Sequence, residues 1–437
     1  MRRTKTGFVR KGLMRLSWPL LVVTVLTLVA ALGNVILLSL ASPELNAAVA
    51  TANQMLGVVY DVSVLFSIGA LVVVAQQLGA GREDSALRSS RAALRASTLL
   101  GTVLAAAVVV VAPFVLRLIN TPEDLIGDAL AYIWVVALGL VFNAYIVAAT
   151  AVLRAYGHTA SILILAIVVN IADVLLLGVF LMVLDLGVVG AALPTLVVRG
   201  IGVLLLMWLL RSRTGVTMLR GEVPAAPQGE RSLWTMTRLS VPTVLENGAY
   251  NLAIVATLSL INVLGSDAIN ARSYALTLTA LVTGVILALA QGNETIVGWD
   301  VGERSLTPAK LMTLRTAAWT AVASAILAAA LWWFAEPVLA IFDANDAVVD
   351  GARGALAVSI VLLPLSAATT VVYGALRSAG DVWIPTVYSI GTSALVLLPL
   401  TWLLVGRLEM GLVGLFWALA GHEAVRAALM RRCARRS

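Results

Sequence analysis

Charged residues are scarce in this sequence. Asp, Glu, Lys and Arg together make up 12% of its 437 residues, whereas 60% of the residues are hydrophobic. A soluble domain carries about 25% charged residues and about 45–50% apolar ones. So few charges cannot cover a water-exposed surface of this size, which excludes a soluble globular protein.

Cysteine and histidine are also nearly absent, and several kinds of chemistry are excluded with them. The one cysteine, Cys433, rules out an intramolecular disulfide. The only histidines are His158 and His422, and neither a phosphate-binding GxxxxGKS/T loop nor an HExxH metal motif occurs. We therefore expect no cofactor, no bound metal and no enzymatic activity. The net charge of +7 does not indicate a nucleic acid partner, because the basic residues lie at the ends of apolar runs.

What the sequence does contain is a series of long apolar runs. An α-helix of about 20 residues crosses about 30 Å of hydrocarbon, and the alternation typical of a membrane β-barrel is absent. The runs therefore predict an all-α integral membrane protein. They place twelve transmembrane helices at 16–41, 47–77, 92–118, 128–152, 160–184, 187–211, 237–264, 269–298, 313–341, 349–373, 383–405 and 410–430.

The basic residues favour one orientation of these helices. Most of the 30 Lys and Arg residues precede the first span, follow even-numbered spans or follow the last span. By the positive-inside rule, both termini are expected in the cytoplasm. The loops after odd-numbered spans contain only Arg117, Arg272, Arg353 and Arg407. Arginine far outnumbers lysine, and Ala and Val are abundant, which suggests a high-GC bacterium and hence its cytoplasmic membrane.

A polar segment divides the spans into two sets of six. It contains GEVPAAPQGERS, whose prolines, glycines and mixed charges are typical of a linker. The expected organisation is a cytoplasmic N-terminal segment at 1–15, a first lobe at 16–211, a cytoplasmic linker at 212–236, a second lobe at 237–430 and a cytoplasmic basic tail at 431–437.

The two lobes share a sequence pattern at a fixed offset. LSWP at the start of the first lobe corresponds to LSVP at the start of the second. The residue pairs that are 223 positions apart include Pro19 and Pro242, Gly69 and Gly292, Gly79 and Gly302, and Arg154 and Arg377. Because each half has an even number of spans, we predict two parallel-repeat six-helix bundles, an architecture typical of secondary transporters.

Several short elements of the chain resemble the multidrug and toxic compound extrusion (MATE) family. They are QQLGAG at 76–81, VLRAYGHT at 152–159 with ALRSAGDV at 375–382, GVVGAAL at 187–193 and VPTVLENG at 241–248. The resemblance implies two six-helix lobes that export organic, often cationic, compounds in exchange for H⁺ or Na⁺. The chain departs from the family's pattern at Asn34, where many members carry an acid, and in the fifth helix, where Asp173 follows Asn170 by three residues instead of four.

Acidic residues inside the spans are the candidates for ion coupling, because an acid at the bilayer centre costs about 2.5–3.5 kcal/mol on insertion scales. Glu246 is the first choice, since its own span contains no basic residue beyond Arg238 in the first turn and Tyr250 shares its helix face. The alternative is that Glu246 reaches the cytoplasmic interface. The further ion-coupling candidates are Asp173, Asn170, Asp61 and Asn34.

Arg199 is a basic residue at mid-depth, and it could neutralise Asp61 or Asp173 by pairing with one of them. Glu294 is a secondary candidate. We expect Glu294, and the pair His422 and Glu423, near the interface. The candidates for lining a substrate cavity are Tyr250, Asn247, Tyr60, Tyr145, Tyr274 and Arg199.

These observations favour a secondary active exporter of small organic, cationic compounds in antiport with H⁺ or Na⁺. Its expected partners are the substrate, the coupling ion and membrane lipids, and we expect a monomer. An alternative is a flippase or exporter of a lipid-linked or peptide-like metabolite, which an Arg-rich cavity between the lobes would favour. A major facilitator is disfavoured, because GAGREDSALRSSR does not supply a GxxxDRxGRR loop. A membrane-embedded enzyme or a non-transporting scaffold is less favoured still.

Overall fold

Two compact units make up the chain, Met1–Val241 and Pro242–Ser437. The computed structural model describes residues 7–42, 49, 52–53, 56–57, 59–118, 123–184, 186–218, 232–340 and 345–436. The boundary between the units falls inside a helix, a few residues after the predicted linker. Most of that linker, at 219–231, lies outside the described residues.

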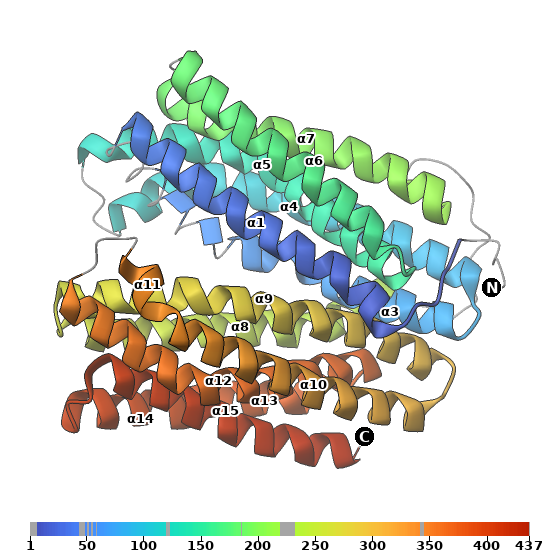
Figure 1. Ribbon diagram of the computed structural model, residues 1–437. Coiled ribbons are helices and arrows are strands. Elements are labelled where there is room, and N and C mark those ends of the chain that lie inside the picture. The colour runs from blue at the N-terminus through green and yellow to red at the C-terminus, as the bar shows by residue number, and fades with distance from the viewer. Residues whose placement is uncertain are drawn as a thin grey trace. The chain divides into compact units, whose positions relative to one another are not determined.

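The first unit is built from helices (Figure 1). They are α1 (Leu13–Ala41), α3 (Leu65–Gly79), α4 (Glu83–Leu118), α5 (Glu123–Ala155), α6 (Thr159–Gly178) and α7 (Gly187–Thr214). The second apolar helix as a whole covers Val59–Gly79. A π-helical turn, Val179–Val183, extends α6.

The second unit is built in the same way. Its elements are α8 (Ser232–Asn262), whose first turns belong to the first unit, α9 (Ser266–Gly302), α10 (Leu306–Trp333), α11 (Ala335–Ala340), α12 (Asp346–Ala379), α13 (Trp383–Thr392), α14 (Leu398–Thr401) and α15 (Gly411–Arg436). The π-helical segment Ser393–Leu397 joins α13 to α14, and a second one, Trp402–Arg407, extends α14, so that one apolar helix covers Trp383–Arg407.

Twelve helices in the described part of the chain are long and apolar enough to cross a membrane. This finding confirms the prediction of an all-α integral membrane protein. Some helices exceed the predicted spans: α4 begins at Glu83 instead of 92, and α9 ends at Gly302 instead of 298. Polar end turns continue such a helix beyond the apolar run that marks the hydrocarbon layer. The predicted ninth span, 313–341, is α10 followed by the separate short helix α11.

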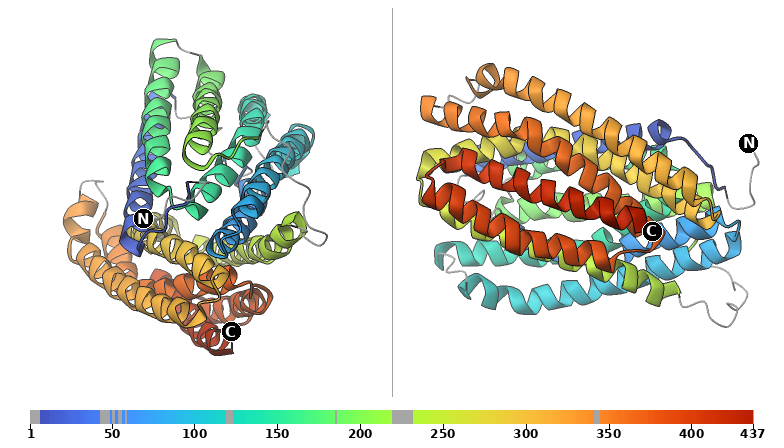
Figure 2. Two further views of the ribbon diagram at one scale, coloured as in Figure 1. Left: turned by 90° about the vertical axis from the view of Figure 1, so that its right-hand side faces the viewer. Right: turned by 90° about the horizontal axis from the view of Figure 1, so that it is seen from below.

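The 223-residue repeat is preserved in the packing and in the turns. α5 packs against α3, α4 and α7, and α12 packs in the same way against α9, α10 and α15, which Figure 2 shows from two further directions. Gly157 after α5 and Gly380 after α12 have φ angles of 82° and 95°. In both turns the glycine N–H donates to the carbonyl of the repeated arginine, Arg154 or Arg377. Glycine adopts this left-handed conformation without strain, which explains its recurrence at the helix end.

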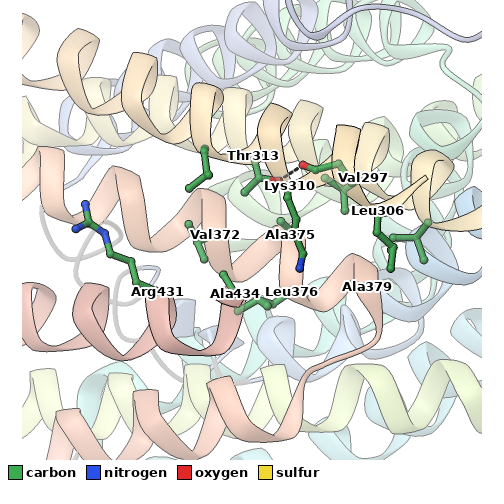
Figure 3. Close-up of a pocket in the computed structure, with 13 residues that line it drawn as sticks. Val297, Leu306, Lys310, Thr313, Val372, Ala375, Leu376, Ala379, Arg431 and Ala434 are labelled. Carbon is green, nitrogen blue, oxygen red and sulfur yellow. Dashed lines mark hydrogen bonds between the residues drawn. The ribbon is translucent and has the colours of Figure 1, made fainter. Parts of the chain in front are cut away.

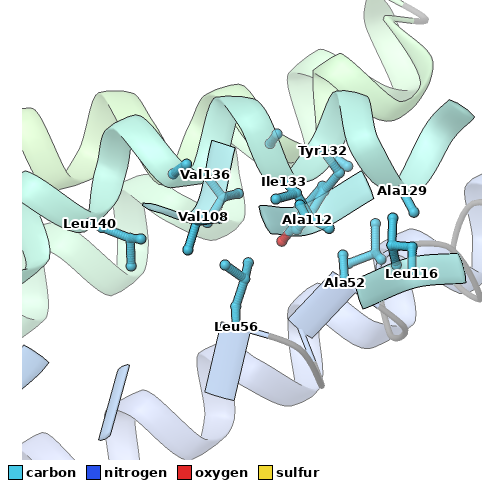
Figure 4. Close-up of a cluster of buried hydrophobic side chains, with 14 of the residues drawn as sticks. Ala52, Leu56, Val108, Ala112, Leu116, Ala129, Tyr132, Ile133, Val136 and Leu140 are labelled. Carbon is cyan, nitrogen blue, oxygen red and sulfur yellow. The ribbon is translucent and has the colours of Figure 1, made fainter. Parts of the chain in front are cut away.

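Small and aliphatic side chains fill the core between α4 and α5 (Figure 4). Ala112 and Leu116 of α4 belong to the same buried cluster as Ala129 and Ile133 of α5. The small alanines let the two helices approach closely, which is the main source of packing energy between helices in lipid.

Gly69 of α3 permits a close approach between α3 and the first turns of α8, within the first unit. A Cβ atom at this position would lie 2.4 Å from the carbonyl oxygen of Met236, so a larger residue does not fit. The Gly69 N–H donates to the Ser240 hydroxyl at 2.8 Å.

Candidate functional site

The second unit contains an ion pair between two helices that are distant in sequence. α8 places Glu246 near its middle, and α15 places Arg426 opposite it. Arg426 Nη2 donates to Glu246 Oε1 at 2.5 Å, and the side chains are only 15% and 9% exposed. Both charges are thus removed from solvent, and each supplies the partner that a buried charge requires.

Arg426 also binds a second carboxylate. Its Nη1 lies 3.3 Å from Glu423 Oε1, and its Nε donates to the Ser389 hydroxyl at 3.0 Å. The other oxygen of Glu423, Oε2, accepts a hydrogen bond of 2.6 Å from the Thr369 hydroxyl of α12. We call Glu246, Glu423, Arg426 and His422 the polar cluster. Two carboxylates share one guanidinium in it.

His422 completes the polar cluster. Its ring stacks on Tyr250 of α8 with 6.1 Å between centroids, and its Nε2 lies 3.4 Å from the Ser393 hydroxyl. His422 is 1% exposed, and Nδ1 lies 3.9 Å from Glu423 Oε1, beyond hydrogen-bonding distance. The sequence places these groups together because residues 422, 423 and 426 share about one turn of α15.

A small cavity of about 100 Å³ adjoins the polar cluster. The residues that line it are Glu246, Asn247, Tyr250, Ser389, Ser393, His422 and Arg426. Glu246 Oε2 is buried and has no hydrogen-bond partner in the described part of the chain. An unpaired carboxylate oxygen at a cavity is a place where a cation can bind or a proton can be added.

The backbone beside this cavity departs from regular α-helix. The segment from Ser393 to Leu397 is π-helical, and the Leu398 N–H donates to the Ser393 carbonyl. Pro399 follows directly. Because a proline ring collides with the carbonyl four residues earlier, a widened turn in front of it relieves the clash. The widened turn places Ser393 next to His422.

A second buried ion pair joins α9 and α12. Arg377 Nε donates to Glu294 Oε1 at 2.7 Å, and the Ser378 hydroxyl donates to the Glu294 carbonyl at 2.8 Å. Glu294 is 3% exposed. The Tyr373 ring lies 5.6 Å from the Arg377 guanidinium and 5.7 Å from that of Arg426. Tyr373 therefore links this pair to the polar cluster through cation–π contacts.

The sequence predicts Glu294, His422 and Glu423 near the membrane interface, and it does not single out Arg426. In the structure all four side chains lie among packed helices. The missed signal is the spacing of His422, Glu423 and Arg426 on one stretch of helix, inside the predicted span 410–430.

The first unit contains a different polar contact. Asn34 of α1 donates through Nδ2 to Asp173 Oδ2 of α6 at 2.7 Å. Arg199 contacts Tyr60: its Nη2 donates to the Tyr60 hydroxyl at 3.0 Å, and its guanidinium lies 5.1 Å from the Tyr60 ring centre. The structure brings Asn34 and Asp173 together, whereas Asn170 donates to the Ala166 carbonyl of its own helix at 2.8 Å.

The remaining candidates are scattered. Asp61 is half-buried in the second helix of the first unit, and Tyr145 is buried in α5. Tyr274 packs against a hydrophobic cluster of the second unit, away from the polar cluster. Tyr250 and Asn247 do line the small cavity beside Glu246.

Two repeated helical bundles with charged groups buried between their helices define a multi-pass membrane transporter. A family model described as MatE matches residues 19–179 and 242–403, most of each repeat, and the chain therefore belongs to the MatE family.

Relatives and solved structures agree with this assignment over nearly the full chain. The uncharacterized transporter YisQ of Bacillus subtilis (strain 168) is 24% identical, with 96% of this chain and 93% of YisQ aligned. The probable multidrug resistance protein NorM of Thermotoga maritima is 20% identical over 96% of this chain and 91% of NorM. A MOP superfamily transporter from Pyrococcus furiosus has the same fold, with a TM-score of 0.88 at 19% identity over 97% of this chain and 94% of that one. A MATE transporter in a straight conformation gives a TM-score of 0.89 at 20% identity, over 97% and 95%.

Proposed function

We propose that this transporter exports small organic cations in antiport with H⁺, and that Glu246 is the coupling carboxylate. The observation that carries the proposal is the polar cluster, in which Glu246 and Glu423 share the single guanidinium of Arg426. We further propose that the protein lies in the bacterial cytoplasmic membrane, with both termini in the cytoplasm, and that it works as a monomer.

Charge balance supports antiport. With both carboxylates ionised and His422 neutral, the cluster of Glu246, Glu423 and Arg426 carries one net negative charge. One proton, or one cationic group of a substrate, neutralises it. Both together would leave a net positive charge among packed helices, which is strongly unfavourable. Proton loading and substrate binding then exclude each other, as an exchange cycle requires.

The contacts of Arg426 supply a structural consequence of proton loading. While Glu246 is ionised, Arg426 connects α8 to α15. A proton on Glu246 removes the charge that holds this contact, and Arg426 keeps Glu423 and Ser389 as partners. The connection between α8 and α15 therefore weakens on protonation, which is a two-state element of the kind that alternating access needs.

The same contacts favour H⁺ over Na⁺. The guanidinium already occupies Oε1 of both carboxylates and Thr369 bonds Oε2 of Glu423, so a metal ion would find too few free oxygen ligands, whereas the single free oxygen of Glu246 suffices for a proton. The small cavity of about 100 Å³ is below the range of about 300–1,000 Å³ typical of ligand pockets, so it accommodates a charged group of a substrate rather than a whole organic molecule.

Transport by proteoliposomes tests the proposal. Efflux of a panel of cationic dyes is measured with a pH gradient and a Na⁺ gradient imposed separately. We expect the pH gradient alone to drive export by the wild type. Glu246→Gln retains the side-chain shape but mimics the protonated state, so it should fold, insert and lose gradient-driven export. Glu246→Asp should retain part of the activity, because the shorter side chain misplaces the charge.

The exposed Glu336 supplies the matched control, since its pair with Arg353 is open to solvent. Glu336→Gln should export at the wild-type rate. If Glu246→Gln exports normally while Asp173→Asn abolishes transport, the coupling site lies in the first unit. Export driven by Na⁺ alone would contradict the choice of ion.

A further inference from the structure

A larger cavity lies in the second unit, apart from the polar cluster (Figure 3). Its volume is about 510 Å³, and the described residues that line it come from α9, α10, α12 and α15. It is located where α9 ends, α10 begins and α12 ends. Its walls are largely aliphatic and include Val297, Val301, Val372 and Leu376.

The neutral polar group of this cavity is already bonded. The Thr313 hydroxyl donates to the Ala309 carbonyl at 2.9 Å and accepts from Asn293 Nδ2 at 3.4 Å. Apart from Lys310 and Arg431, the described lining residues therefore offer an uncharged polar ligand no free side-chain partner. The cavity does not suit a sugar or another neutral polar molecule.

Two basic side chains, Lys310 of α10 and Arg431 of α15, lie at the cavity. Figure 3 shows the Lys310 side chain directed between the helices, whereas the Arg431 side chain extends outward, away from the other labelled residues. Both residues are exposed, and neither forms an ion pair or hydrogen bond with any other residue in the described ranges. Among the residues that the structure describes, no acidic one lines the cavity. Two unpaired positive charges thus border an apolar space.

The position of the cavity matches the edge of the hydrocarbon layer. Lys310 lies about one turn into α10, which begins at Leu306, and Arg431 lies about one turn before the end of α15. Long basic side chains at such positions reach the level of lipid headgroups. Leu306 and Leu314, which also line the cavity, are 48% and 59% exposed, so the cavity opens onto the surface of the unit.

We propose that this cavity binds an anionic membrane phospholipid, with an acyl chain against the aliphatic walls and the headgroup at the edge of the cavity that Lys310 and Arg431 border. Aliphatic walls without free hydrogen-bonding groups match a hydrocarbon chain. Two basic side chains at the membrane interface match an anionic headgroup. A free inorganic anion would leave the apolar volume empty, and a zwitterionic lipid would bring a positive group toward Lys310 and Arg431.

Native mass spectrometry of the purified full chain tests this site without any transport measurement. The protein is titrated with phosphatidylglycerol and, separately, with phosphatidylcholine of the same acyl chains. We expect preferential retention of phosphatidylglycerol. Lys310→Gln and Arg431→Gln should each weaken its binding by about fivefold, the effect expected of one basic residue near an anionic lipid surface. Both side chains are exposed, so the variants should fold.

Three controls separate this site from general surface charge. Arg315→Gln removes an exposed charge of α10 that does not line the cavity, and it should leave binding unchanged. Ala375→Leu narrows the cavity and should weaken binding with both charges intact. Dodecyl phosphate should displace the lipid, whereas inorganic phosphate should not.

Equal retention of the two lipids would overturn the proposal, and so would an effect of Arg315→Gln as large as that of Lys310→Gln. Displacement by inorganic phosphate at the concentration effective for dodecyl phosphate would show a site for free anions instead. If Ala375→Leu does not fold, the charge substitutions still decide the question.

Discussion

Both side chains of the ion pair between Glu246 and Arg426 are buried. This burial determines how much stability the protein loses when one of the two is replaced. Arg426→Gln leaves Glu246 and Glu423 close together without the guanidinium between them. Breaking a buried pair in this way costs about 3–5 kcal/mol. We expect Arg426→Gln to lower the free energy of unfolding by about 3 kcal/mol, measured by denaturant titration of the purified protein in detergent.

The double variant distinguishes charge from packing. Because Glu246→Gln removes one of the two uncompensated charges, Glu246→Gln with Arg426→Gln should recover much of the lost stability. The exposed pair of Arg353 and Glu336 is the control: its side chains are 43% and 67% exposed, so Arg353→Gln should cost less than about 1 kcal/mol. Additive losses in the double variant would show that the two side chains do not interact.

The sequence identifies Glu246 but not its partner. Glu246 and Arg426 are 180 positions apart, and periodicity along one helix contains no information about which face meets which neighbouring helix. Because charged residues are rare within the apolar runs, the acidic candidates could be identified from the sequence. The partner could not be chosen, because several arginines lie at similar distances from helix ends and only packing selects one of them.

The glycine that ends α12 provides a test of backbone strain at a helix end. Gly380 ends α12 with φ 95°, and its N–H donates to the Arg377 carbonyl at 3.0 Å. A residue with a Cβ is strained in this conformation by about 1–2 kcal/mol. Gly380→Ala should therefore lower the free energy of unfolding by about 1 kcal/mol, again by denaturant titration. Gly12→Ala, at a glycine with φ −74° and nothing within 4 Å of an added Cβ, should not. Equal effects of the two substitutions would exclude backbone strain as the cause.

The repeated turn also shows where the two halves have diverged. Gly81 has φ 70° after α3, and Arg304, 223 positions later, has φ 60° after α9. The hydrogen bonds are the same: Arg82 N–H donates to Gln77 O, and Ser305 N–H donates to Asp300 O. The backbone of the repeat therefore persists where glycine has been replaced. Such turns are predictable from the offset in the sequence, whereas a non-glycine residue with positive φ is not.

His158 attaches the N-terminal segment to the turn between α5 and α6. Its Nε2 donates to the Gly7 carbonyl at 2.8 Å, and Val9 N–H donates to the Tyr156 carbonyl at 3.1 Å. Burial is the main cause that lowers the pKa of His158. The hydrogen bond to the Gly7 carbonyl opposes this shift, and the positive charges of Lys11 and Arg213 add smaller lowering effects.

This pKa direction predicts how the attachment depends on pH. A histidine whose pKa is lowered on folding binds protons more weakly in the attached state than in the released one. The attachment is therefore fully stable above the ordinary pKa of about 6.5, and it weakens as the pH falls below that value. Amide hydrogen exchange at Val9, corrected for intrinsic rates, should show weaker protection at pH 5 than at pH 8. His158→Gln should remove the difference. An unchanged pH dependence in this variant would assign the effect to another group.

Across the whole molecule, the two units share the arrangement of their helices but not the positions of their buried charged residues. The position 223 residues before Glu246 is Val23, and the position 223 residues before Arg426 is Val203. The first unit instead has the contact between Asn34 and Asp173. Helix packing is therefore common to both units, whereas the polar groups differ, which is consistent with ion coupling at one of them. The twelve helices and the repeat could be predicted, because apolar runs and fixed offsets are properties of the sequence itself.

Topology is the last prediction, and it concerns all twelve helices at once. The positive-inside rule places the loop after the sixth helix in the cytoplasm and the loop after the fifth outside. Gly221 and Asp185 lie in these loops, outside the described residues. In a Cys433→Ser background, Asp185→Cys should react with a membrane-impermeant maleimide in intact cells, and Gly221→Cys only after permeabilisation. Because helices cross the membrane alternately, the reverse pattern at both sites would invert the whole protein. It would also move Lys310, near the start of α10, and Arg431, near the end of α15, to the outer leaflet.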